Sequence, residues 1–422
     1  KPARVDGFSH VRSLGGIHEY RLDSNGLTVL LAPDASVPVV TFQVTYRVGS
    51  RNEVSGTTGA THLLEHLMFK GNDISRYLEA AGAAYNATTW LDRTSYFATL
   101  DPQALEGYVA IEADRMRNLR LNDADRQDEM TVVRNELERA ENSSGHLLTK
   151  EVYAAAYLAH PYHHPTIGWR SDIENVSIDS LRGFYDTFYW PDNATVSIVG
   201  NIEPEQALAL VRRHFGRIPR SQRPIPQVYT QEPPQNGPRR VVLRRAGALG
   251  LLMIAYKGPH GRHEDLPALT VLAEILGIGN GSRFARELVD TSLATFADAG
   301  IQPTHDPGLF VVRVMLAPEA THEQVEKAVL AQIERVKNEG VSAEEVARVI
   351  ARYRAEQAYA RDGTMGVAGM LNEWIAVGDW TLYFNHPEQI ATVTAADVQR
   401  VAREYLLEDR STTGWFVPVV SP

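Results

Sequence analysis

Alternating apolar and polar positions near the start of the chain predict a small antiparallel sheet. Two short β-rich segments, 20–22 and 27–31, flank the polar turn Asp23-Ser24-Asn25-Gly26. A longer, partly β-branched run extends from Val39 to Val48. Runs of this kind bounded by turn residues are typical of strands. Residues 18–50 are therefore expected to form a small antiparallel set of strands joined by turns.

Helical periodicity dominates much of the remaining chain, because apolar residues recur every three or four positions. Helices are predicted at 61–70, 76–81, 105–120, 124–141, 178–187, 321–338 and 343–361, with further strands within 84–99 and 194–199. Helices and strands that are mixed along the chain in this way predict the α+β class.

The second half of the chain repeats the first. Ile173 begins the segment Ile-Glu-Asn-Val-Ser, and Ile390, 217 positions later, begins Ile-Ala-Thr-Val-Thr. The same offset relates three further pairs: Leu181 and Val398, Phe188 and Tyr405, and Asn193 and Arg410. A weaker match relates the segments that begin at Val44 and Ile254. The repeat predicts two related structural copies.

A proline-rich segment separates the two copies. We therefore expect a domain at 1–216, a linker at 217–239 and a homologous domain at 240–422. Each domain is expected to be an α/β sandwich, a sheet packed with helices.

Composition narrows the range of functions. A chain of 422 residues is too long for one ordinary core, and its 44% hydrophobic and 22% charged content is typical of a globular protein. The longest apolar runs are too short to span a membrane. A net charge of −10 argues against nucleic-acid binding. Because the chain has no cysteine, a metal site must use His, Asp or Glu.

The helix predicted at 61–70 carries the candidate chemistry. His62 and His66 are four positions apart and project from one face, and Glu65 borders that face. The rest of this helix is apolar, so burying two histidines and a carboxylate is costly unless something binds them. These residues predict a zinc site in which the imidazoles bind the ion and the carboxylate lies beside a bound water.

A third zinc ligand must come from elsewhere. The helix predicted at 124–141 offers Glu129, Glu136, Glu138 and Glu141, and spacing alone does not choose among them. Glu129 and Glu136 are seven apart and lie nearly in line on one face. The His-rich loop at 160–165 contains two prolines, which favours a structural or surface role over metal binding.

The segment from Gly59 to Gly71 resembles the inverted HxxEH signature of the pitrilysin and mitochondrial processing peptidase family of zinc metallopeptidases. The resemblance covers essentially the whole chain, which is similar to the short, two-domain, zinc-bearing type that forms half of a clamshell. It implies that Glu136 is the third ligand of one zinc ion per chain. It also implies that Glu129 supports the site by hydrogen bonding.

The resemblance also implies a substrate site. The segment beginning at Tyr85 resembles the family's Asn-Ala-x-Thr strand, to which the substrate adds as an extra strand. Asn86 would bond to the peptide backbone, Ala87 would leave it room, and Phe69 would line a pocket. The implied function is a zinc metalloendopeptidase that cleaves short or unfolded peptides in an enclosed chamber, with Glu65 activating the zinc-bound water.

One part of the family pattern is missing. Val289 and Thr295 stand where an arginine and a tyrosine are expected, and neither can replace those donors. We therefore expect a heterodimer with a homologous subunit that supplies the Arg/Tyr pair. The alternative is a non-catalytic structural or peptide-binding subunit. The start at Lys1, without methionine or an apolar signal core, predicts a processed precursor, with periplasm ahead of cytoplasm or mitochondrial matrix.

Overall fold

Two sheets organise the chain in the computed structural model, which describes residues 1–420. Contacts between Cα atoms group the residues into two units, each built around one sheet. Unit 1 comprises residues 1–135, 165–229 and 358–384, and unit 2 comprises residues 136–164, 230–357 and those from 385 onward. Both units therefore draw on both halves of the sequence.

Unit 1 contains a seven-stranded sheet in the order β1-β2-β3-β7-β4-β6-β5. Neighbouring strands are antiparallel except β3 and β7, which are parallel. The strands are β1 (Phe8–Leu14), β2 (Ile17–Leu22), β3 (Thr28–Pro33), β4 (Val40–Tyr46), β5 (Ala84–Thr89), β6 (Thr94–Leu100) and β7 (Ala194–Gly200). The strands expected from the sequence are present, and β7 lies between β3 and β4.

Strand β4 is buried along its whole length because helices cover both of its faces. On one face, Phe42 packs against Tyr108 of α3 (Leu105–Arg117) and Phe215 of α8 (Pro204–Phe215). On the other face, polar side chains bond to α12 (Gly363–Val377): Thr41 with Thr364, Gln43 with the carbonyl of Ala368, and Thr45 with Asn372. A helix from the end of the sequence thus completes unit 1.

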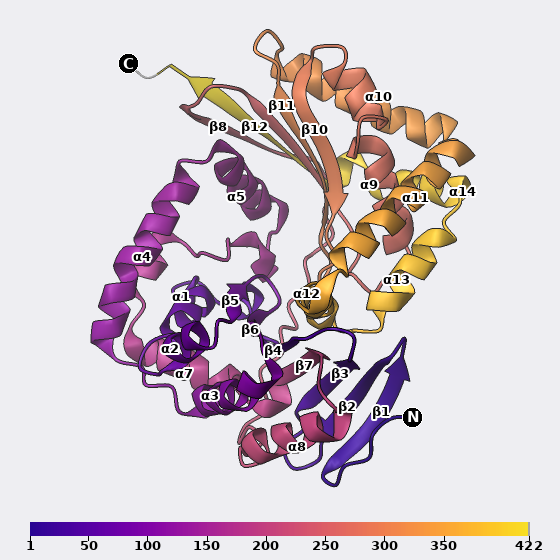
Figure 1. The fold of residues 1–422 in the computed structure, drawn as a ribbon. Helices are drawn as coiled ribbons and strands as arrows, with labels where there is room; N and C mark the ends of the chain where they lie inside the picture. The colour runs from indigo at the N-terminus through magenta and orange to yellow at the C-terminus, as the bar shows by residue number, and fades with distance from the viewer. Residues whose placement is uncertain (421–422) are drawn as a thin grey trace. The chain divides into compact units, whose positions relative to one another are not determined.

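Unit 2 contains a five-stranded sheet in the order β10-β11-β9-β12-β8, in which only β8 and β12 are parallel. The strands are β8 (Arg239–Ala246), β9 (Leu251–Lys257), β10 (Ala294–Ile301), β11 (Leu309–Leu316) and β12 (Ser411–Val419). Helix α5 (Ser144–Ala156), from the first half of the sequence, packs against β8, β9 and β12 (Figure 1). A Cβ at Gly414 would lie 2.4 Å from Val152, so this close packing requires glycine.

The remaining helices are α1 (Ala60–Leu67), α2 (Ile74–Ala80), α4 (Asp123–Glu141), α6 (Arg170–Asn175), α7 (Ile178–Phe188), α9 (Leu266–Gly277), α10 (His322–Glu339), α11 (Ala343–Ala360), α13 (Leu382–Ala391), α14 (Ala395–Tyr405) and the π-helix η5 (Ala285–Val289). Among them, α1, α2, α4, α7, α10 and α11 match predicted segments, and α6, α9, α13, α14 and η5 were not predicted. Across residues 1–420, none of the helices is long and apolar enough to cross a membrane.

The register of the two sheets reproduces the sequence repeat. Val44 of β4 lies opposite Val196 of β7, and its counterpart Ile254 of β9 lies opposite Thr413 of β12. Val196 and Thr413 are 217 positions apart, the offset of the repeat. Apart from β1 and β2, the strand orders of the two sheets also correspond. The predicted α+β fold with two related sheet-bearing parts is confirmed.

The units divide the chain differently from the contiguous domains 1–216 and 240–422. Helix α5, from the first half of the sequence, belongs to unit 2 and packs on its sheet. Helix α12, from the second half, belongs to unit 1 and packs on the sheet there. The described segment 217–238 contains neither helix nor strand, as a linker would. The contiguous division therefore stays a prediction, and the compact units exchange segments.

Candidate metal centre

Helix α1 carries both predicted histidine ligands on one face. Its leucines at 63, 64 and 67 are buried, whereas His62, Glu65 and His66 are half-buried. The helix begins after Gly59, whose φ of 84° lies in the left-handed region. A Cβ there would lie 2.5 Å from the carbonyl oxygen of Ile167, so only glycine allows this approach. The apolar face fixes α1 in the unit and leaves the polar face available.

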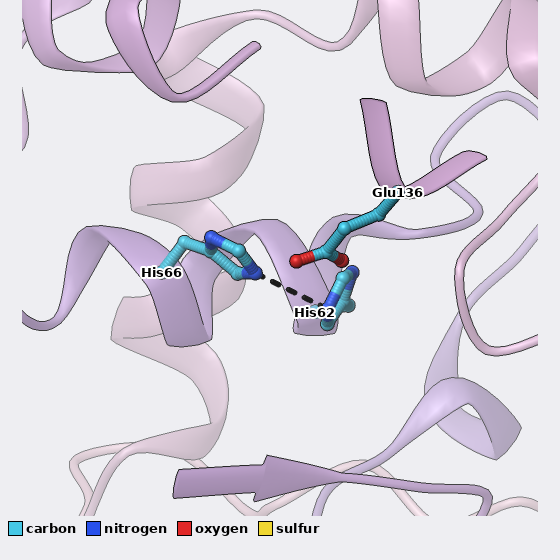
Figure 2. A group of neighbouring side chains, drawn as sticks. All are labelled: His62, His66 and Glu136. Carbon is cyan, nitrogen blue, oxygen red and sulfur yellow. Dashed lines mark hydrogen bonds between the residues drawn. The ribbon is translucent and has the colours of Figure 1, made fainter. Parts of the chain in front are cut away.

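The two imidazoles approach each other closely. Their Nε2 atoms are 3.3 Å apart (Figure 2). Burial, followed by the neighbouring His66, lowers the pKa of His62 to about 4, so His62 is neutral at neutral pH. Two nitrogens bound to one tetrahedral zinc ion at about 2.0–2.1 Å lie roughly 3.3 Å apart. The imidazole spacing therefore fits a shared zinc ion.

Helix α4 contributes two glutamates from its less exposed face. The Oε2 atom of Glu129 lies 2.9 Å from Nδ1 of His66, and its Oε1 atom lies 3.3 Å from Nζ of Lys70. With Nδ1 donating to this carboxylate, Nε2 of His66 keeps the lone pair that a metal needs. Glu129 therefore contacts the ring nitrogen of His66 that faces away from His62.

Glu136 lies one residue beyond the division between the units, but α4 is a continuous helix through that point. One ligand atom from each of His62, His66 and Glu136 lies within 4.8 Å of the others. Figure 2 shows the Glu136 carboxylate beside His62. Two imidazoles and one carboxylate form a donor set that suits zinc. Of the four acidic candidates on this helix, the geometry favours Glu136 as the third ligand.

The candidate base Glu65 has a specific partner. The Oγ1 hydroxyl of Thr89 donates to its Oε2 atom at 2.5 Å. Thr89 is the last residue of β5, so the sheet edge and the metal helix meet at this hydrogen bond. The sequence assigned no role to Thr89 or to Lys70, because a hydroxyl in a strand and a lysine after a helix have no periodic signal of function.

The predicted substrate residues lie on or near β5, which is the edge strand of its sheet and pairs with β6 alone in the described structure. Asn86 is exposed and its Oδ1 atom accepts the backbone N–H of Ala87. Ala87 is buried, and half-buried Phe69 lies 6.4 Å from Tyr85 between ring centroids. An edge strand offers backbone groups to an added peptide. The substrate roles of these residues stay predictions.

The two positions that depart from the family pattern lie in unit 2. Val289 ends the π-helix η5, and Thr295 is exposed on β10. Valine and threonine cannot supply the guanidinium or phenol that the family pattern expects, and the guanidinium of Arg283, six residues before Val289, is paired with Glu345 at 2.9 Å.

The His-rich loop has a structural role in unit 2. The Nδ1 atom of His160 accepts the backbone N–H of Tyr162, and its Nε2 atom lies 2.8 Å from Asp306. Both ring nitrogens are thus occupied by protein contacts, which supports the structural interpretation of this loop over metal binding.

Comparison with known proteins agrees with these features. The model of the insulinase family, peptidase family M16, matches residues 28–169, and the model described as the peptidase M16 inactive domain matches residues 175–353. The HxxEH motif lies within the first match and outside the second.

Relatives with similar sequences are named as zinc proteases or processing peptidases. The chain is 30% identical over 420 residues to zinc protease PqqE of Helicobacter pylori, covering 97% of this chain and 95% of that protein. It is 22% identical to probable mitochondrial-processing peptidase subunit beta of Arabidopsis thaliana, covering 91% of this chain and 75% of that protein. A crystal structure of a protease from Helicobacter pylori is similar with a TM-score of 0.92 and 30% identity, covering 96% of this chain and all of that chain.

Because the likeness to the Helicobacter pylori relative covers 97% of this chain, it extends into both units. The HxxEH segment, the glutamate pair on α4 and the segment beginning at Tyr85 carry the predicted resemblance to this family. The chain belongs to the peptidase M16 family.

Proposed function

We propose that this chain is a zinc-dependent metalloendopeptidase. The observation that carries the proposal is the grouping of His62, His66 and Glu136, with Glu65 on the same helix as both histidines. The names of its relatives as zinc proteases support the same reading. Two half-buried imidazoles and a carboxylate that converge from two helices are costly to remove from water unless something binds them, and a metal ion would do so.

The residues divide the work of peptide hydrolysis. A zinc ion held by His62, His66 and Glu136 would supply a Lewis acid for the scissile carbonyl and for water. Glu65 accepts a proton from the attacking water and passes it to the leaving amine. Thr89 orients the Glu65 carboxylate by donating to Oε2, and Glu129 orients His66. The substrates we propose are short or unfolded peptides that add to the edge of β5 within an enclosed chamber.

A single substitution tests the role of Glu65. Glu65→Gln keeps the size of the side chain but cannot accept the proton, so peptide cleavage should fall by about 10²–10⁴-fold. Zinc content, measured by elemental analysis, should stay at one ion per chain. The matched control is Glu138→Gln, since Glu138 is exposed on α4. Undiminished cleavage by zinc-loaded Glu65→Gln would show that Glu65 is not the base.

Val289 and Thr295 favour one alternative, a non-catalytic structural or peptide-binding subunit. That alternative predicts a chain that binds zinc and peptides but does not cleave them under any condition. Cleavage that depends on the HxxEH residues would exclude it.

The same two positions lead us to propose a heterodimer with a homologous subunit that supplies the missing arginine and tyrosine. One relative is itself named as a subunit of a peptidase. Activity of the purified chain, alone and with any protein that co-purifies with it, tests this arrangement. Full activity of the chain alone would refute it. We propose the periplasm as its location, which cell fractionation would test.

A further inference from the structure

Helix α1 begins on a buried carboxylate. Both oxygens of Glu53 accept backbone N–H groups at its N-terminus: Oε1 from Gly59 at 2.9 Å and Oε2 from Thr61 at 2.8 Å. Glu53 is only 3% exposed. The first N–H groups of a helix have no partner within the helix, and negative charge is favourable at that end. Glu53 therefore satisfies two of these groups with the sign of charge that the helix end prefers.

Helix α1 ends on a buried cation. The Nη1 atom of Arg115, on α3, donates to the carbonyl oxygen of Met68, the residue that caps the helix, at 3.0 Å. Arg115 is 2% exposed, and its guanidinium lies 4.4 Å from the ring centroid of Tyr96 and 5.1 Å from that of Phe69. Glu112, one turn earlier on α3, forms an ion pair with it. Positive charge is favourable at a helix C-terminus.

Buried charges are an expensive way to hold a helix. Transferring one ion from water to a protein interior costs several kcal/mol, whereas a charge at a helix end contributes about 0.3–2 kcal/mol. Stability alone therefore does not account for Glu53 and Arg115. Their contacts do fix the position of an eight-residue helix along its own axis, because a shift in either direction breaks a charge-assisted hydrogen bond.

The duplicated fold provides an internal control. Helix α9 lies in the equivalent place in unit 2, but its N-cap residue Asp265 makes no side-chain bond to the helix. The Asp265 carboxylate instead accepts from Arg400 and Tyr405, both at 2.7 Å. Helix α9 also lacks the HxxEH residues. The bidentate carboxylate cap therefore accompanies the metal ligands, and a helix folds in this position without it.

We propose that Glu53 and Arg115 are positioning residues that hold α1 at both ends, so that His62, His66 and Glu65 keep the spacing that binds the metal ion. This inference rests on the proposed zinc function. Neither residue is placed among the metal ligands. They act through the backbone of α1, and their loss would let the helix slide or tilt, so that the two imidazole nitrogens no longer meet at one point.

The test measures metal binding by the full-length chain. Glu53→Gln keeps the volume, but its amide NH₂ group faces one of the helix N–H groups. The Zn²⁺ dissociation constant, measured against a competing chelator, should rise about 10–100-fold, as it does when other supporting contacts are lost. The visible absorption spectrum of the Co²⁺-loaded protein should also change, because it reports the ligand geometry. Asp265→Asn is the matched buried control at α9. It should change the Zn²⁺ dissociation constant by less than about twofold and leave the Co²⁺ spectrum unchanged.

Arg115→Lys provides an independent variant, since it retains the charge but loses the planar fork. Its control is Arg283→Lys, because Arg283 is also buried and donates to a carbonyl oxygen, that of Gly340. Unchanged Zn²⁺ affinity and an unchanged Co²⁺ spectrum in both Glu53→Gln and Arg115→Lys would overturn the inference. So would unfolding of both metal-free variants under conditions in which both controls stay folded, because the two charges would then serve the fold.

The result is separable from the test of the proposed function. A wild-type chain that binds Zn²⁺ without cleaving peptides would refute the peptidase and leave the positioning roles standing. Full peptide cleavage together with unchanged metal affinity in Glu53→Gln would refute the positioning roles and leave the peptidase standing. A wild-type chain that binds no Zn²⁺ would overturn both.

Discussion

Helices α1 and α9 occupy equivalent places in two copies of one fold, yet they bury different chemistry. Helix α1 packs against β5 and α7, and α9 packs against the corresponding elements β10 and α14. Both β5 and β10 are edge strands. The inner residues of α9 include Leu272, Ile275 and Leu276, all fully buried, whereas α1 carries two imidazoles and a carboxylate.

The difference separates what the fold requires from what the metal site requires. Burying one leucine or isoleucine side chain stabilises a protein by about 1.5–3 kcal/mol. The buried apolar side chains of α9 each contribute this stabilisation. Helix α1 has fewer of them, because His62, Glu65 and His66 are polar groups that are costly to bury. The fold therefore requires an apolar helix at this place, and the HxxEH residues are an addition that the fold tolerates.

The largest expected effect comes from making α1 resemble α9 at one ligand. His66→Leu removes a metal ligand and replaces it with the residue type that fills α9. We expect the Zn²⁺ affinity to fall by more than about 100-fold, beyond the loss from a supporting contact. The thermal unfolding temperature of the metal-free protein should not fall, because an apolar side chain replaces a half-buried imidazole. Isothermal titration and thermal denaturation would measure the two quantities.

A smaller effect is expected from weakening the apolar packing of α9. Leu272→Ala should lower the free energy of unfolding by about 2–5 kcal/mol, since Leu272 is fully buried. The Zn²⁺ affinity should be unchanged, because α9 carries none of the ligands. Chemical denaturation would measure the loss, with Leu330→Ala, at a side chain that is 39% exposed, as the milder control. A change in Zn²⁺ affinity would show that the two helices are coupled, contrary to the comparison.

The smallest effect concerns Glu274, an ionisable side chain that α9 partly buries. Burial, and then the nearby carboxylate of Glu356, raises the pKa of Glu274 to about 7, and its Oε2 atom is buried without a hydrogen-bond partner. Between pH 4.5 and 7 the folded state keeps a proton that the unfolded state has lost, so stability falls as pH rises through this range.

Replacing this carboxylate by an amide should remove that pH dependence. Glu274→Gln should stabilise the protein at pH 8 by about 1 kcal/mol, a modest value because the side chain is only partly buried and screened by solvent. At pH 4 the difference should vanish. Unfolding temperatures of the wild type and Glu274→Gln across this range would measure it, with exposed Glu287→Gln as control. An equal difference at both pH values would contradict the assignment.

Local patterns predicted the metal helix and the repeat because both depend on short-range spacing. The four-residue separation of His62 and His66 places them on one face of any helix, and the pairing of β4 with β7 recurs in the pairing of β9 with β12. Spacing left four glutamates on α4 as candidates, since residues on one helix differ only in what lies opposite them. The family resemblance selected Glu136 among them, and the tertiary structure places its carboxylate close to both histidines.

Other features had no local signal. An amphipathic helix does not specify which sheet it will cover, so the exchange of α5 and α12 between the sequence halves was not predictable from periodicity. Charged residues are usually exposed, so Glu53 and Arg115 gave no sign of burial. The contact between Thr89 and Glu65 likewise joins a strand to a helix that are far apart in the sequence.

The packing of α12 on unit 1 also determines when that unit can complete its folding during synthesis. The sheet of unit 1 bonds through Thr41, Gln43 and Thr45 to α12, which ends at Val377. These polar side chains cannot find their partners until the ribosome has made nearly the whole chain. Domains usually complete their folding in the order of translation. Unit 1 therefore cannot complete its packing until α12 has been made, although its sheet lies in the first half of the sequence, and a chain truncated in the linker would lack the helix that covers one face of β4.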